Sequence, residues 1–434
     1  MDSSQTRIAK PLRYVKFRLR QWRTRRERPA LIARAFRRAS ELATSRKAPS
    51  RSALLLPTAS PGNLGDDAVF RATVERLLKD DFDPVTIISF SDDELYEIPG
   101  AETVVMPLHH SPRGEEYLAF VEELSRYSHY FVWGADIVDG THGLGVLEPR
   151  IVTTNLAARM GVKTNICSFS VSDQRTKAAM VLYHTLDEAV VLQCRDETSA
   201  ERLREDLPDR SIEVTADLAF MLEPDYSAPI SMAAKAWCDA RRVEGKILMG
   251  VNINDLFCSY FDIPRDDLLR YFADALTDLA VRHPDIAIIH IPHDTHANKT
   301  LGKMTDFTLA KQLNALLPEA LSMQSFIPEE SLSAPEVRAI CSYLDLIFSS
   351  RMHLSIASLA VGTPVFALAY QGKFEGLFRH FGLEHMFITH NQLSDRALVA
   401  NFLKSAVERR EKVRADISEE LPRVKAIANN NLAI

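Results

Sequence analysis

The sequence has few cysteines, few glycines and no long apolar segment, and each shortage excludes a class of protein. Its five cysteines are odd in number and scattered, without a Cys-x-x-Cys pair (Cys167, Cys194, Cys238, Cys258 and Cys341). This pattern predicts reduced thiols in a cytoplasmic protein and argues against a disulfide framework or a zinc site. Sixteen glycines and 21 prolines among 434 residues are too few for a collagen-like or low-complexity chain. No apolar run approaches the roughly 20 residues that cross a bilayer, and the N-terminus lacks the apolar core of a secretion signal.

The chain has an ordinary globular composition with an uneven distribution of charge. Hydrophobic residues make up 46% and charged residues 25%, and the length predicts a large core and two or three domains. Residues 1–51 carry 16 Lys and Arg against three acids, a balance of +13, which leaves −19 for the rest of a chain whose net charge is −6. A basic arm therefore precedes an acidic body.

Apolar residues in the arm recur every three or four positions (Ile8, Leu12, Val15, Leu19 and Trp22, then Ile32, Ala35, Phe36, Ala39 and Leu42). This spacing predicts a basic amphipathic helix, interrupted near Pro29. Such a helix suits an anionic membrane surface, and we expect contact with the inner face of the plasma membrane through residues 7–44. A flexible solvated arm, a helix docked on the acidic body and an organelle transit peptide are the alternatives. Nucleic acid is not expected as a partner, because the body is acidic and lacks a basic aromatic platform.

After residue 51, short β-rich runs alternate with helical patterns, and the alternation restarts after a polar stretch at residues 224–229. This order predicts an α/β fold of two doubly wound, Rossmann-like domains that face a central cleft. We expect a basic extension at 1–50, domains at 51–225 and 226–394, and a C-terminal helical segment at 395–434, with its helix over 395–412. The main strands are predicted at 53–56, 85–90, 103–106, 130–133, 163–169 and 189–194, and then at 247–251, 286–291, 346–349 and 364–368.

In such folds ligands bind at the carboxyl ends of the strands, so the loops from strand to helix are the candidate sites. The first such loop contains Gly62, Asn63, Gly65 and Asp66. Its glycines allow backbone amides to approach a ligand, and the helix that follows favours anions. It is neither a Gly-x-Gly-x-x-Gly nor a Walker A motif, and Asp66 is equally suited to cap the helix.

A second loop contains Ser349, Ser350, Arg351 and His353, and Lys373 follows the next strand. Hydroxyl groups, backbone amides and a guanidinium at a helix start make a good seat for an anion. A bound anion would favour the imidazolium form of His353, which is a proton donor. We expect Arg351, His353 and Lys373 to surround one crevice, although a lone histidine at a helix start is often only a cap or surface residue.

Two further loops complete the set. Arg195 follows a strand of the first domain and is expected at the same crevice, with a simple ion pair to a neighbouring acid as the alternative. Residues 290–296 hold three histidines and an aspartate. Because the spacing is not His-Glu-x-x-His and Pro292 forbids a regular helix, we expect His290 and His293 to contact a sugar or phosphate and expect no metal site.

These segments, in this order, resemble the polysaccharide pyruvyl transferase family, over roughly residues 53–385. The residues that match its motifs are Gly62, Asn63, Gly65 and Asp66 (Gly-Asn-x-Gly-Asp), Arg195, Asp196 and Ser199 (Arg-Asp-x-x-Ser) with a following Asp217, and Ser350, Arg351, His353, Gly362, Pro364, Tyr370 and Lys373 (Ser-Arg-x-His…Gly-x-Pro…Tyr-x-x-Lys). One departure is clear. Where such proteins usually carry a Gly-Gly-Gly-like turn after the fourth strand, this chain has Trp133-Gly134-Ala135-Asp136.

The resemblance implies transfer of a pyruvyl group from phosphoenolpyruvate to two hydroxyls of a sugar in a surface polysaccharide precursor, which gives a cyclic ketal. It also implies the GT-B-like fold of metal-independent glycosyltransferases, no cofactor, and a saccharide acceptor that is lipid-linked in many pathways. On this basis His353 would transfer the proton, and Arg195, Arg351 and Lys373 would hold the donor. Asp66 and Asn63 would contact donor or acceptor from the facing domain, with Ser349, Ser350 and Tyr370 nearby. A sugar-nucleotide glycosyltransferase and a non-catalytic polysaccharide-assembly protein of the same fold are the alternatives.

Overall fold

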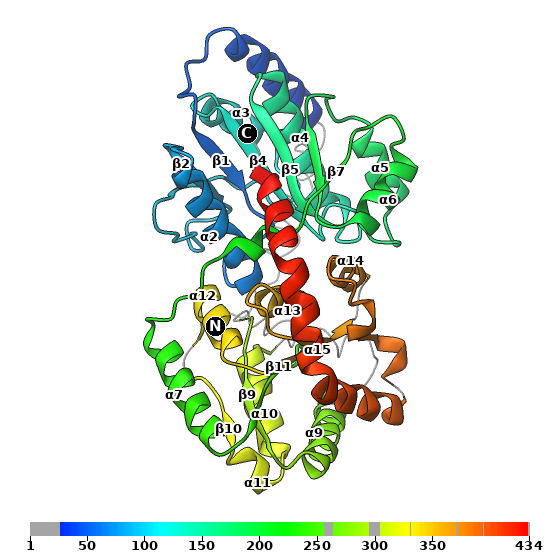
Figure 1. Ribbon diagram of the computed structural model, residues 1–434. Helices are drawn as coiled ribbons and strands as arrows, with labels where there is room; N and C mark the ends of the chain where they lie inside the picture. Colours follow the sequence, from blue (N-terminus) through cyan, green and yellow to red (C-terminus); the bar gives the residue numbers. More distant parts are fainter. Residues whose placement is uncertain are drawn as a thin grey trace, which may run out of the picture.

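The computed structural model describes residues 27–255, 264–294, 304–329, 331–369, 372–393 and 395–432. They form two parallel β-sheets with helices on both faces, and Figure 1 shows the two sheets one above the other. The first sheet has the strand order β3-β2-β1-β4-β5-β6-β7. Its strands are β1 (Ala53–Leu56), β2 (Val85–Ser89), β3 (Glu102–Val105), β4 (His129–Ala135), β5 (Lys163–Phe169), β6 (Val191–Cys194) and β7 (Glu213–Val214).

The second sheet repeats this winding with the order β10-β9-β8-β11-β12-β13. Its strands are β8 (Ile247–Asn252), β9 (Ile286–His290), β10 (Ser325–Phe326), β11 (Leu346–Ser349), β12 (Val365–Ala369) and β13 (Phe387–Thr389). The expected α/β class with two doubly wound sheets is therefore confirmed. The boundaries that we expect between the domains stay a prediction.

The helices that connect these strands have the following bounds. Around the first sheet they are α2 (Leu64–Lys79), α3 (Glu115–Leu124), α4 (Leu144–Arg159), α5 (Lys177–Tyr183), α6 (Glu197–Asp206) and the short 3-10 helix η1 (Leu218–Met221). Around the second they are α7 (Pro229–Val243), α9 (Arg265–Arg282), α10 (Asp306–Leu316), α11 (Glu319–Ser322), α12 (Ala334–Ser342), α13 (Met352–Leu359), α14 (Lys373–Arg379) and α15 (Arg396–Asn429).

In each sheet the direction in which successive strands are added reverses at one strand. The two reversal points lie at equivalent strands, β1 and β8. In the first sheet β1 lies between β2 and β4, and in the second β8 lies between β9 and β11. The loops that leave these neighbouring strands in opposite directions open a crevice at the carboxyl edge of the sheet, which is where ligands bind in such folds. The loops that follow β1, β4, β8 and β11 are therefore the expected sites of ligand binding and catalysis.

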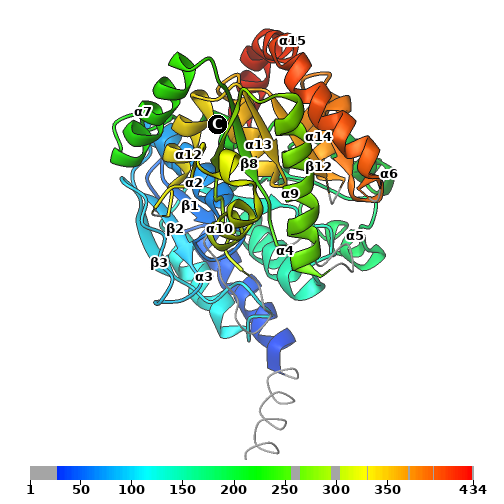
Figure 2. The same ribbon diagram turned by 90° about the horizontal axis from the view of Figure 1, so that it is seen from below.

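Residues 27–43 of the basic arm form a helix that docks on the first domain (Figure 2). Ala35 and Ala39 are fully buried, and they belong to the same apolar cluster as residues of α3 and α4. Two arginines pair with acids of the body: Arg28 with Glu148 at 2.8 Å and Arg38 with Glu122 at 2.6 Å. For residues 27–43 the structure therefore shows a helix docked on the acidic body, which is one of the alternatives given for the arm above. The first apolar stripe lies outside the described residues.

Helix α15 is longer than the sequence predicts. It runs from Arg396 to Asn429, with Pro422 inside it, where the helical pattern predicts an end near residue 412. The helix crosses from the second sheet to the first (Figure 1), and its buried residues belong to an apolar core that contains residues of both sheets. This packing explains the extra turns, because a helix that is buried on both domains continues past the point where its own sequence favours it.

Among the residues that the structure describes, no helix has the length and apolar content needed to span a membrane.

Candidate active site

The loops of the two domains meet in the cleft between the sheets. The first loop, after β1, touches the second domain directly, because Asn63 forms an isolated antiparallel β-bridge with Asp294 beyond β9. Asn63 also caps α2, and its side chain accepts a hydrogen bond from the amide of Gly65 at 2.9 Å. The loop is thus fixed at both ends, which holds Asp66 in the first turn of α2.

Two glycines allow the domains to approach so closely. A Cβ on Gly65 would lie 2.1 Å from Nδ1 of His353, and a Cβ on Gly376 would lie 2.3 Å from Cγ of Asp196. Both distances are far inside van der Waals contact, so no side chain fits at either position. The loops that follow β1 and β11 are therefore in direct contact at Gly65 and His353.

His353 lies in the first turn of α13 and faces acids of the first domain. Its Nε2 is 3.7 Å from Oδ2 of Asp217, and its side chain is 17% exposed. Asp217 caps η1 and accepts a hydrogen bond from Arg195 at 3.0 Å, in an ion pair whose two side chains are each 4% exposed. Nε of Arg195 also donates a hydrogen bond to the hydroxyl of Ser170 at 2.7 Å. An imidazole, a carboxylate and a guanidinium thus form one chain across the cleft.

Two carboxyl groups near His353 have pKa values that move in opposite directions. Burial alone would raise the pKa of Asp217, but the His353 ring and the Arg195 guanidinium outweigh it and lower the pKa to about 2. Burial raises the pKa of Asp66, although the charge of His353 and a hydrogen bond from Thr58 at 2.7 Å act against the rise. Carboxyl groups with divergent pKa values are typical of sites that need both an acid and a base.

Lys373 begins α14 and reaches the first domain. Its Nζ forms an ion pair with Oδ2 of Asp136 at 2.7 Å. Burial would raise the pKa of the Asp136 carboxyl, but the charges of Lys373 and Arg195 lower it well below its usual range. Lys373 and Arg195, one from each domain, therefore both lie near Asp136. Arg195 itself is held in the ion pair with Asp217, which is the alternative stated for it above.

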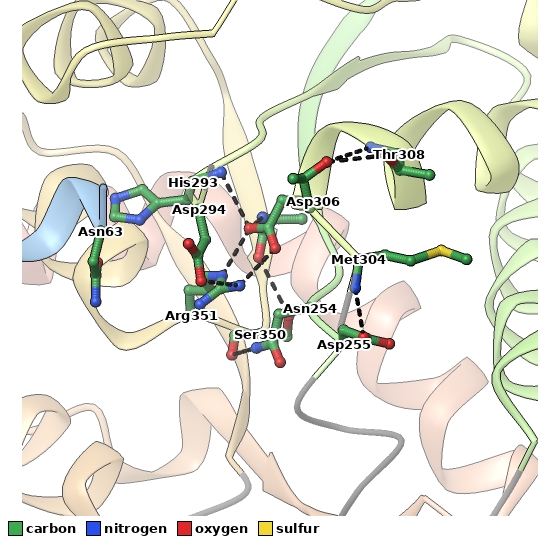
Figure 3. A network of polar contacts seen from close by, with 12 residues as sticks. Asn63, Asn254, Asp255, His293, Asp294, Met304, Asp306, Thr308, Ser350 and Arg351 are labelled. Atoms are coloured by element: carbon green, nitrogen blue, oxygen red, sulfur yellow. Dashed lines mark hydrogen bonds and ion pairs between the residues drawn. The ribbon is translucent and has the colours of Figure 1, made fainter. Parts of the chain in front are cut away.

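Arg351 is paired with acids of its own domain. Its guanidinium forms two hydrogen bonds with Asp306, at 2.7 and 2.6 Å, and an ion pair with Asp294 at 3.1 Å (Figure 3). The side chain is 9% exposed. Two carboxylates that compensate a buried guanidinium leave it less able to bind an anionic ligand. Arg351 instead braces the loop that carries Asp294 and, through the β-bridge, Asn63.

The hydroxyl groups of Ser349 and Ser350, before Arg351, also form hydrogen bonds within the protein. Ser349 accepts a hydrogen bond from the amide of Arg351 at 3.0 Å, and Ser350 donates to Asn252 at 3.2 Å. Both serines are fully buried, so they shape the turn and do not line the cleft.

The two histidines after β9 are buried as well. His290 contacts Asn314 at 3.3 Å, and burial lowers its pKa to about 4. Burial also lowers the pKa of His293 to about 3. These surroundings contradict the expected sugar contact for His290. Within the described ranges no group of three or more His, Cys, Asp or Glu side chains is placed to hold a metal ion. Tyr370 lies outside the described residues.

An open cleft of about 510 Å³ adjoins the cluster. It is lined by the loops after β4 and β5, by α6 and by the start of α14, and Asp136 and Lys373 lie on its wall. A cavity of this size fits a small ligand with a few polar contacts.

Two residues of this wall were not among the predicted site residues. Asp136 directly follows β4, and Arg202 lies on α6, where it donates to the carbonyl of Val171 at 3.1 Å and lines the cleft. The position of Asp136 at a strand end would have identified it. Nothing in the sequence around Arg202 distinguishes it from a surface residue of an amphipathic helix.

Comparison with known proteins agrees with the motifs. The family model for polysaccharide pyruvyl transferase matches residues 63–372. No curated protein matches the chain significantly.

Several solved structures share the fold at low identity. A putative UDP-N-acetylglucosamine 2-epimerase from Listeria monocytogenes is 10% identical, with a TM-score of 0.54 over 88% of this chain and 94% of that one. An α,α-trehalose-phosphate synthase from Burkholderia xenovorans is 12% identical, with a TM-score of 0.52 over 88% and 99%. The N-terminal domain of trehalose-6-phosphate phosphatase from Candida albicans is 10% identical, with a TM-score of 0.52 over 89% and 96%. These similarities are to GT-B-like folds and establish the architecture alone.

Proposed function

The chain belongs to the polysaccharide pyruvyl transferase family, and we propose that it transfers the pyruvyl group of phosphoenolpyruvate to two hydroxyls of one sugar. The products would be a cyclic ketal and inorganic phosphate. The observation that carries this proposal is that His353 of one domain lies 3.7 Å from Asp217 of the other, which is ion-paired with Arg195, while Arg195 and Lys373 both lie near Asp136.

The reaction balances without a cofactor. A proton adds to the methylene carbon of phosphoenolpyruvate, and the second carbon becomes oxocarbenium-like. One sugar hydroxyl attacks this carbon and loses its proton. The carbon–oxygen bond to phosphate then breaks, the second hydroxyl adds to the same carbon, and its proton leaves with the phosphate. The enzyme must therefore supply one proton and accept one, and the departing phosphate takes the other.

We assign the proton transfers to His353 and Asp66. His353 is the principal group, because its ring lies 3.7 Å from Asp217, a carboxylate whose lowered pKa keeps it ionised. Asp66, whose pKa is raised by burial, is suited to the second transfer. Each group would contribute roughly 10²- to 10⁴-fold to the rate. Arg195 and Lys373 would hold the carboxylate and phosphate of the donor, and Asn63 would contact a substrate from the loop after β1.

Turnover tests the assignment. With phosphoenolpyruvate and a saccharide panel, phosphate release and the mass of the ketal product are measured for the wild type, His353→Asn and Lys373→Met. We expect kcat to fall at least 10²-fold for His353→Asn and the KM for phosphoenolpyruvate to rise at least ten-fold for Lys373→Met. Near-wild-type turnover in either variant would disprove the role of that residue.

A thermal-shift panel separates the alternatives. We expect phosphoenolpyruvate to raise the melting temperature and UDP-sugars to leave it unchanged. Stabilisation by UDP-sugars alone would indicate a glycosyltransferase, and stabilisation by neither, without turnover, would indicate a non-catalytic assembly protein.

We also propose that the arm brings the cleft to a lipid-linked acceptor at the inner face of the plasma membrane. The basic apolar pattern of residues 7–24 supports this. Because residues 27–43 cover the core of the first domain, the matched control is a variant that begins at Glu27. Full-length protein should float with anionic liposomes and the shortened variant should not, and equal flotation would contradict the proposal.

A further inference from the structure

The turn after β4 has an unusual backbone and a charged residue at its end. Ala135 adopts a φ of +43°, a left-handed conformation that side-chain-bearing residues rarely take. Gly134 before it cannot carry a side chain, because a Cβ there would lie 2.5 Å from Cβ of Phe169. Residues held in such conformations are frequent at ligand sites. Here the turn directs Asp136 into the cleft.

Asp136 of the first domain contacts the second domain through only one of its two carboxylate oxygens. Its Oδ2 holds Nζ of Lys373 at 2.7 Å. Among the described residues no hydrogen bond is made to Oδ1, and the side chain is 31% exposed on the wall of the 510 Å³ cleft. One oxygen therefore contacts the cation that we assign to the donor, and the other is open to a second ligand.

The rest of the cleft wall is rich in hydrogen-bonding groups and has more acids than bases. The carboxylate of Asp139 ties the two loops of the wall together, since it accepts from the hydroxyl of Thr141 at 2.6 Å and from the hydroxyl of Ser172 at 2.6 Å. Asp173 and Glu375 add further negative charge, against Arg202 and Lys373. This wall favours a neutral ligand with many hydroxyls and disfavours a diphosphate.

We propose that Asp136 binds a hydroxyl of the acceptor saccharide through Oδ1 and thereby determines acceptor specificity. The proposal rests on the proposed function, and it identifies the cleft as the seat of a neutral polyol beside the donor. Asp136 also competes with an anionic donor for Lys373. Its removal should therefore weaken the acceptor while leaving the donor unaffected or bound more tightly.

The test compares Asp136→Ala with Asp239→Ala. Asp239 is a matched control because it also forms a lysine pair, with Lys235 at 2.6 Å, on the exposed face of α7. In steady-state turnover we expect Asp136→Ala to raise the KM for the acceptor roughly 10- to 100-fold, as for the loss of a hydrogen bond to a charged group. The KM for phosphoenolpyruvate should not rise. Asp239→Ala should change neither constant.

Two results would overturn the proposal. If the KM for phosphoenolpyruvate rises as much as that for the acceptor, Asp136 only positions Lys373. If both constants stay at the wild-type value, Asp136 contacts no substrate.

A measurement of saccharide binding without phosphoenolpyruvate tests the role of Asp136 independently of the proposed reaction. Saturation-transfer NMR is recorded with the methyl glycosides of glucose, galactose and mannose in the absence of phosphoenolpyruvate. A glycoside signal in the wild type that is lost in Asp136→Ala and kept in Asp239→Ala supports the proposal even if no ketal is ever formed. The same spectrum for the wild type and Asp136→Ala, including no signal in either, contradicts it.

Discussion

At the residue scale, Gly65 lies directly against His353 of the other domain. A methyl group at position 65 would lie 2.1 Å from Nδ1 of the imidazole, so Gly65→Ala must displace the ring or part the domains. We expect kcat to fall at least ten-fold, because small displacements of a proton-transfer group are costly. Phosphate release measures the effect. Asp239→Ala, on the exposed face of α7, is the control, and activity of Gly65→Ala equal to that of the control would show that the contact is not needed.

We expect Asp66 to lower the stability of the folded protein at neutral pH while it supports turnover. Its pKa is raised in the folded protein by burial, whereas an unfolded aspartate titrates near about 3.9. The folded state therefore binds the proton more tightly, and wild-type stability falls as the pH rises above about 4 through the folded pKa. Asp66→Asn removes this penalty.

We expect Asp66→Asn to be more stable than the wild type at pH 8 and nearly equal to it at pH 4, with turnover lost. Urea unfolding across this pH range measures the difference. Asp67→Asn, which breaks the helical pair with Arg71 at 2.8 Å, should instead lose about 0.2–0.5 kcal/mol. A stability difference for Asp66→Asn that does not grow with pH would contradict the explanation.

At the scale of elements, α15 depends on the residue that follows its end. The side chain of Asn431 is fully buried and binds three backbone groups: it accepts from the amide of Ser168 at 3.1 Å and donates to the carbonyls of Ala216 at 2.7 Å and Ala428 at 2.8 Å. An aspartate would replace the donating amide with a second acceptor and bury a charge.

Asn431→Asp should therefore lower the free energy of unfolding by about 3 kcal/mol or more. The exposed neighbour Asn430 provides the control, and Asn430→Asp should cost less than about 0.5 kcal/mol. Urea unfolding of both variants measures the difference. If Asn431→Asp is as stable as Asn430→Asp, the end of α15 is not an anchor.

At the scale of the whole molecule, one apolar core contains residues of both sheets, and α15 lies across them. Two domains that share a core should unfold together. The chain has three tryptophans, of which Trp133 lies in β4 and Trp237 in α7. With Trp22 replaced by Phe, Trp133→Phe and Trp237→Phe leave one reporter in each half.

We expect the fluorescence of the two single-tryptophan proteins to change at urea midpoints that coincide once each is corrected for the stability of its variant by circular dichroism. Two separate transitions in either protein would show that the halves unfold independently.

The sequence predicted those parts of the fold and site that local patterns encode. The central strands follow from continuous apolar runs, and 53–56, 163–169 and 346–349 agree with β1, β5 and β11 to the residue. The edge strands β7, β10 and β13 have two or three residues, which is too short for any periodicity. Likewise, Gly65, Asp66, Arg195, His353 and Lys373 were identified because each follows a buried strand, and the ends of parallel strands must meet at one edge.

What the sequence alone determined is the order of strands and helices, and with it the edge at which the loops gather, since both follow from apolar spacing along a single segment. The tertiary structure decided which side chains on that edge face the cleft. Arg351 turns to Asp294 and Asp306, and Asp136 reaches Lys373, because the partner of a charged group is set by whichever opposite charge the folded chain brings within a few ångströms, and these partners lie more than 40 residues apart in the sequence.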